Sequence, residues 1–142
     1  LVGWRIASAL ARGMKINRIL VIDDEPRVSD MVKFALGGRG PFHVREENDF
    51  THAAATARSY RPDVIVFDVD PPWDESCDAA RQFDSDPVLR AVPVVRLSAL
   101  ESEKAAAHLS GVLFISKPVD PNCLMDVIAR ALTPQTALCA LS

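Results

Sequence analysis

The chain alternates between short, continuous apolar runs and longer stretches in which apolar residues recur every three or four positions. Continuous runs are typical of strands buried on both faces, and the periodic stretches are typical of helices that bury one face. Four runs predict strands at residues 18–22, 64–67, 92–97 and 112–116, and a charged run at 42–46 predicts a short strand near an edge. Because strand and helix patterns alternate five times, we expect an α/β fold built on parallel βαβ units with right-handed crossovers.

Five helices are expected between and after these strands. Asn48 or Asp49 can cap the second, and Asp120 can cap the last, where a proline follows at the first helical position. Asp86 should end the third helix, because the residue before a proline disfavours the helical region. The expected ranges are 28–36, 50–59, 75–84, 102–109 and 121–132.

Polar side chains stand where four of the predicted strands end. Asp23 and Asp24 follow the first strand, Asp68 follows the third, and Ser98 and Lys117 follow the last two. Parallel strands end at the same edge of a sheet, and open α/β sheets bind their ligands at that carboxyl edge. We therefore expect all five side chains to meet there.

Three carboxylates at one edge predict a bound cation. Two of them repel by roughly 4 kcal/mol at about 4 Å and an effective dielectric of about 20. Carboxylate oxygens suit Mg²⁺, which leaves the hydroxyl and the ammonium group to bind a phosphoryl group. Taken singly, Asp24 or Ser98 would be interpreted as a helix cap and Lys117 as a solvated lysine, so the hypothesis rests on the joint pattern.

Four segments stand in the order that is typical of one protein family. They read ILVIDDEP at residues 19–26, VIVFD at 64–68, VVRLSA at 94–99 and FISKP at 114–118. Over residues 17–132 the chain resembles the CheY-like receiver domain of two-component response regulators. The resemblance implies a single doubly wound, five-stranded parallel sheet in the order 2-1-3-4-5, flanked by five helices. We expect a stand-alone receiver, with residues 1–16 as an N-terminal extension and residues 133–142 as a short tail.

The resemblance also implies a role for each residue at the carboxyl edge. Asp68 would be the phosphoacceptor, which takes a phosphoryl group from a sensor histidine kinase or a histidine phosphotransfer protein. Mg²⁺ would be held by Asp23, Asp24, Asp68 and the backbone carbonyl of Asp70. Lys117 would pair with a phosphoryl oxygen.

A switch is implied as well. Ser98 would move toward the phosphoryl group, and Phe114 would follow it inward, which changes a surface that an unknown downstream protein reads. On this interpretation the chain is a signalling phosphoacceptor and not an enzyme, beyond catalysing its own phosphoryl transfer and dephosphorylation.

Other interpretations stay open. Residues 67–70, FDVD, resemble the first motif of haloacid-dehalogenase-type phosphatases, in which the first aspartate is also a phosphorylated nucleophile. In that family the acidic metal pair follows the nucleophile, whereas Asp23 and Asp24 precede Asp68. The chain can also be a fragment of a larger regulator. A receiver that acts only through protein contacts is disfavoured by the complete acidic triad.

Composition narrows the function classes further. The 142 residues, 49% hydrophobic and 25% charged, fit one globular domain. The net charge is −3 and no basic cluster reverses it locally, so we expect no nucleic-acid partner. No apolar run is long enough to span a membrane, and we expect no membrane partner. Three cysteines without metal-ligand spacing, Cys77, Cys123 and Cys139, predict thiols in a reducing cytosol and thus a cytoplasmic location.

Overall fold

Five parallel strands form one sheet in the order β2-β1-β3-β4-β5. The structure, a computed structural model, describes residues 13, 15–23, 26–36, 41–68, 81–98 and 113–132. The predicted α/β class and strand order are therefore confirmed. The strands are β1 (Asn17–Ile22), β2 (Phe42–Glu47), β3 (Val64–Asp68), β4 (Val94–Ser98) and β5 (Leu113–Ser116).

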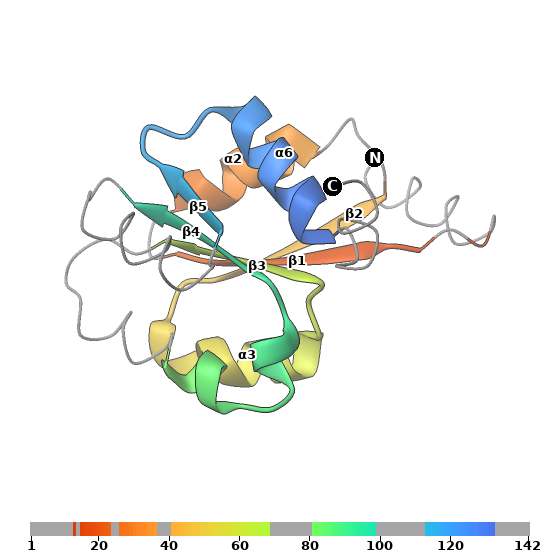
Figure 1. Ribbon diagram of the computed structural model, residues 1–142, viewed down its shortest axis with the longest axis vertical. Coiled ribbons are helices and arrows are strands. Elements are labelled where there is room, and N and C mark those ends of the chain that lie inside the picture. The colour runs from red at the N-terminus through yellow and green to blue at the C-terminus, as the bar shows by residue number, and fades with distance from the viewer. Residues whose placement is uncertain are drawn as a thin grey trace, which may run out of the picture.

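Helices cover both faces of this sheet. Figure 1 shows α2 (Pro26–Leu36) and α6 (Pro121–Leu132) on one face and α3 (Ala53–Tyr60) on the other. Of the predicted third helix, the described part is helical at residues 81–85. The helix predicted at 102–109 lies outside the described residues.

Two sequence predictions are wrong in detail. The stretch predicted as one helix at 50–59 is divided into a 3-10 turn, η1 (Phe50–His52), followed by α3. Strand β4 begins at Val94 and not at Val92, because a second 3-10 turn, η2 (Leu89–Ala91), precedes it. The Val92 amide donates to the Leu89 carbonyl at 3.0 Å, so this part of the chain still turns.

Strand β1 lies in the middle of the core. Its residues 19–22 are fully buried, because β2 and β3 flank it and helices cover both of its faces. Ile19 and Val21 face α2 and α6, whereas Leu20 and Ile22 face α3. Each such side chain stabilises the fold by about 1.5–3 kcal/mol on burial. The continuous apolar run in the sequence is thus explained by burial on two sides.

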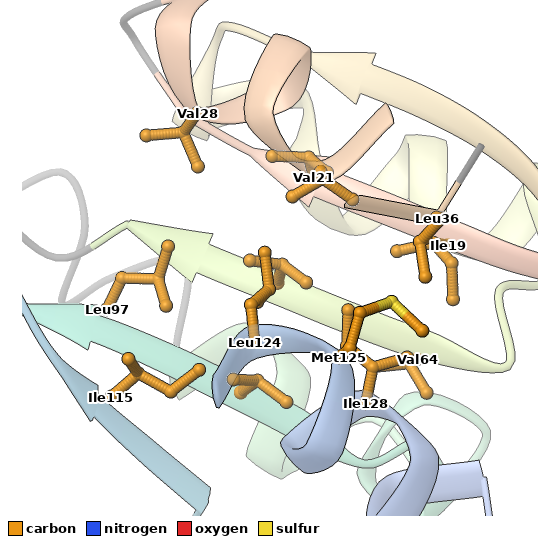
Figure 2. Close-up of a cluster of buried hydrophobic side chains, with 13 residues drawn as sticks. Ile19, Val21, Val28, Leu36, Val64, Leu97, Ile115, Leu124, Met125 and Ile128 are labelled. Carbon is orange, nitrogen blue, oxygen red and sulfur yellow. The ribbon is translucent and has the colours of Figure 1, made fainter. Parts of the chain in front are cut away.

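The first core layer lies between the sheet and the pair α2 and α6. In α2, the buried residues Val28, Val32 and Leu36 recur every fourth position and so share one face. In α6, Leu124 and Ile128 do the same, and Figure 2 shows these side chains meeting those of the strands. The amide of Asn122 donates to the Asp120 carboxylate at 2.9 Å, which confirms the predicted cap of this helix.

The second layer, beneath α3, is built from methyl groups and aromatic rings. Ala53, Ala54 and Ala57 are buried against the sheet. Next to them, Phe67 of β3 lies between Phe50, with ring centroids 5.7 Å apart, and Phe83, at 6.2 Å. Each such aromatic pair adds about 0.5–1.5 kcal/mol beyond its burial. The 3-10 turn η1, which precedes α3, is capped by Asp49, whose carboxylate accepts from the Thr51 amide at 2.9 Å.

The structure also bears on the predicted absence of a membrane span and on the cysteines. No helix among the described residues is long and apolar enough to cross a membrane. Cys123 is an exposed free thiol near the start of α6, and the other two cysteines lie outside the described residues.

Tyr60, the last residue of α3, connects this helix to the edge strand β2. Its hydroxyl donates to the His43 carbonyl at 2.9 Å, and its oxygen lies 2.5 Å from Nδ1 of the His43 ring. The Tyr60 hydroxyl has one proton, which it donates to the His43 carbonyl. In the second bond the His43 Nδ1–H must therefore donate to the Tyr60 oxygen. Burial raises the pKa of Tyr60 to about 12, although Arg18 and Arg45 lower it in part.

Titration of the phenol tests this arrangement. Tyr60 is the one tyrosine of the chain, so phenolate absorbance reports it alone, and we expect a midpoint near pH 12 in the folded protein. The unfolded chain in urea should titrate near pH 10. Between about pH 10 and pH 12 the native state keeps the phenol proton of Tyr60, whereas the unfolded state has released it. The contribution of the buried phenol to the free energy of unfolding is therefore complete below about pH 10 and is lost as the pH rises through about 12. Equal midpoints in both states would contradict the burial of this hydroxyl.

Candidate functional site

Asp68 and Lys117 form an ion pair at the carboxyl edge of the sheet. The Lys117 ammonium donates to Oδ1 of Asp68 at 2.5 Å. Asp68 is the last residue of β3, with 5% of its side chain exposed, and Lys117 follows β5, with 22% exposed. At this burial the attraction is weakly screened, so the pair links the end of β3 to the residue after β5, on the other side of β4.

Ser98 lies beside this pair at the end of β4. Its neighbour in the β5 register is Ser116, and its carbonyl accepts from the Lys117 amide at 3.0 Å. Ser98 is 1% exposed, so its hydroxyl is enclosed by protein. The peptide bond between Lys117 and Pro118 is cis. The structure therefore brings together three of the predicted site residues.

Asp23 approaches the same edge from β1. In the register of β1 and β3, Ile22 stands opposite Phe67, so Asp23 and Asp68 each follow by one residue on neighbouring strands. Such strands lie about 4.8 Å apart. The Asp23 amide donates to the Glu47 carbonyl at 3.0 Å, which extends the β1–β2 ladder to the site, and Asp23 is fully buried.

The carboxylates fit a divalent cation by their chemistry. Asp23 and Asp68 are both buried, and placing two anions side by side in the interior is costly unless positive charge compensates them. Lys117 supplies one positive charge, and hard carboxylate oxygens are the ligands that Mg²⁺ takes. Within the described ranges no group of three metal-ligating side chains forms. Two predicted ligands, the Asp24 carboxylate and the Asp70 backbone carbonyl, lie outside those ranges.

The predicted switch residue Phe114 lies on β5 and is half-buried. Its register partner on β4 is Arg96, which in turn stands opposite Phe67 on β3. Arg96, whose Nε is buried, was not among the predicted site residues. A charged residue inside an otherwise apolar strand is the sequence signal that could have pointed to it.

The charge balance of the site predicts different stabilities for its variants. In metal-free buffer, Lys117→Met should lower the free energy of unfolding by about 3 kcal/mol, because it removes a positive charge that pairs with a buried carboxylate. Asp68→Asn should cost less than about 1 kcal/mol, since it also removes repulsion with Asp23. Urea unfolding measures both values. Equal losses in the two variants would show that Asp23 and Asp68 do not interact.

Comparison with known proteins identifies the family to which this site belongs. The response regulator receiver domain matches residues 19–129. The chain belongs to this family. Its members are signalling phosphoacceptors that act with histidine kinases and downstream targets and generally use Mg²⁺. Neither the structure nor these comparisons favour the haloacid-dehalogenase alternative.

Individual relatives agree with this assignment. PilH of Pseudomonas aeruginosa is 30% identical over 118 residues, which cover 81% of this chain and 97% of PilH. The probable transcriptional regulatory protein TcrX of Mycobacterium tuberculosis is 34% identical over 101 residues, which cover 70% of this chain. The match spans only 43% of TcrX, so the receiver corresponds to part of that protein.

A solved structure shows the same fold. The chemotaxis protein CheY4 of Vibrio cholerae superimposes with a TM-score of 0.70 at 24% identity, covering 83% of this chain and all of CheY4 (100%). At this identity the likeness concerns the fold alone.

Proposed function

We propose that this receiver accepts a phosphoryl group on Asp68 from a phosphohistidine of a sensor histidine kinase or a histidine phosphotransfer protein. The observation that carries the proposal is the ion pair between Asp68 and Lys117, because it places a cation within 2.5 Å of the nucleophilic carboxylate. Family membership supplies the reaction class.

In the transfer, a carboxylate oxygen of Asp68 attacks phosphorus as the P–N bond to the donor imidazole breaks. The products are an acyl phosphate and the imidazole, which takes up a proton. Lys117 then has phosphoryl oxygens within reach and stabilises the charge that develops on them. Asp23 and Asp68, together with Asp24 and the Asp70 carbonyl, would hold Mg²⁺, which neutralises phosphoryl charge when it is bound.

The output of the site is a change around Ser98 and Phe114. Ser98 is enclosed next to Lys117, so a phosphoryl group on Asp68 offers its hydroxyl a strong acceptor nearby. Movement of Ser98 frees space beside β5, into which the half-buried ring of Phe114 turns. A downstream protein would read the surface that α6 and β5 form.

Labelling by a small phosphodonor tests the phosphoacceptor. Acetyl phosphate with Mg²⁺ should add one phosphoryl group to the wild-type chain, and Asp68→Asn should abolish this addition. Asp126→Asn is the matched control, since it changes the same group at an exposed position of α6. Intact mass measures the label, and a chelator should suppress it. Equal labelling of wild type and Asp68→Asn would overturn the assignment.

Amide exchange tests the switch. In wild type, beryllofluoride should alter exchange at residues 98–118, and Ser98→Ala should reduce this response while phosphorylation persists. Ser116→Ala is the control, because Ser116 is the register partner of Ser98 on β5 but is exposed. If Ser98→Ala responds as wild type does, the switch does not pass through this hydroxyl.

A further inference from the structure

Three basic side chains gather on the α3 face of the sheet near its β2 edge. Arg18 of β1 and His43 of β2 are register partners, and Arg45 stands two residues beyond His43, so all three share one face. All three are exposed. Arg18 and His43 are each the second residue of their strand, whereas Asp68 ends β3 at the carboxyl edge of the sheet. We call these residues, together with Tyr60, the cationic surface.

The aromatic ring of Tyr60 organises this surface. The guanidinium carbon of Arg18 lies 5.9 Å from the ring centroid, and that of Arg45 lies 5.7 Å away. The ring itself is fixed by the two hydrogen bonds to His43. Two guanidinium groups are thus held over one aromatic ring, where each gains a cation–π contact but repels the other. Part of the entropy that binding a ligand would cost is already lost in the free protein.

Acidic groups nearby are engaged elsewhere. The Asp63 carboxylate accepts from the Arg18 amide at 2.8 Å and lies 3.4 Å from the Lys15 ammonium. Glu47, on the same face of β2, accepts from the Thr56 hydroxyl at 2.5 Å. Because Lys15 balances Asp63, the cationic surface keeps a local excess of positive charge in a chain whose net charge is −3. The sequence shows no basic cluster at these positions, because the fold joins residues that are far apart in the chain.

We propose that the cationic surface binds an acidic segment of a partner protein through carboxylate groups. The planar guanidinium group matches the geometry of a carboxylate and pairs with it through two parallel hydrogen bonds. Two guanidinium groups presented by adjacent strands suit two acidic side chains of an extended segment. A long polyanion such as nucleic acid suits the surface less, because the rest of the chain is negative and would repel it.

The cationic surface is separate from the proposed phosphoacceptor site. Its four residues lie in β1, β2 and α3, and none of these four residues belongs to the phosphoacceptor site. A partner can therefore be held here in either phosphorylation state, and the unphosphorylated chain is sufficient for the test.

Fluorescence anisotropy with a labelled oligoglutamate peptide tests the proposal. Wild type should bind the peptide, more weakly as salt rises. Arg18→Gln with Arg45→Gln should weaken binding about tenfold, since two exposed charge pairs are lost. The matched control, Arg90→Gln with Arg130→Gln, changes net charge equally at exposed positions elsewhere and should bind within about twofold of wild type.

Two Tyr60 variants examine the role of the ring, with circular dichroism confirming that each is folded. Tyr60→Phe keeps the ring but loses both hydrogen bonds to His43, so it should bind more weakly than wild type. Tyr60→Leu also removes the ring beneath both guanidinium groups and should bind several-fold more weakly than Tyr60→Phe.

Three outcomes would overturn the proposal. The first is that wild type fails to bind the peptide at low salt. The second is that both double variants lose affinity equally, which would assign binding to net charge alone. The third is that single-stranded DNA binds more tightly than the peptide with the same dependence on Arg18 and Arg45, which would indicate a nucleic-acid surface instead.

Discussion

The register of β1 against β2 and β3 is the constraint on which both the core and the site depend. Side chains alternate between the two faces of each strand, so a slip by one residue would exchange the two apolar layers. The same register places Asp23 beside Asp68, one residue past the paired Ile22 and Phe67. The apolar residues that specify the fold thus also set the separation of the charges, and no additional element is needed to bring the carboxylates together.

The carboxyl edge is a region where charge opposes stability. Asp23 and Asp68 are buried as neighbouring acids, and Lys117 compensates only part of their charge. A hydrophobic residue at either acidic position would remove this repulsion, but it would also remove a carboxylate that we propose acts in Mg²⁺ binding and phosphoryl transfer. The two apolar layers on either side of β1 supply the stability that offsets this cost.

The sequence alone was sufficient for the features that local chemistry determines. Continuous apolar runs located the strands, and Asp120 was predicted as a cap, as the structure has it. For the segment that begins at Phe50 the sequence offered Asn48 or Asp49, and the structure shows Asp49. Features that depend on distant residues were missed. Nothing local showed that Val92 continues a turn, and the cationic surface exists only because β1, β2 and the end of α3 meet.

The position of β1 inside the sheet, between β2 and β3, also affects how the chain is made on the ribosome. Ile19 pairs with Val64, which is synthesised 45 residues later, so at about 5–20 residues per second the strand waits roughly 2–9 s for its inner neighbour. The outer neighbour β2 emerges sooner, since Asn17 pairs with Phe42. Until then the apolar strand β1 is exposed with both of its edges unpaired, which is the condition under which nascent chains associate with one another. The order of the elements in the sequence therefore makes β2 the first segment that protects the growing chain.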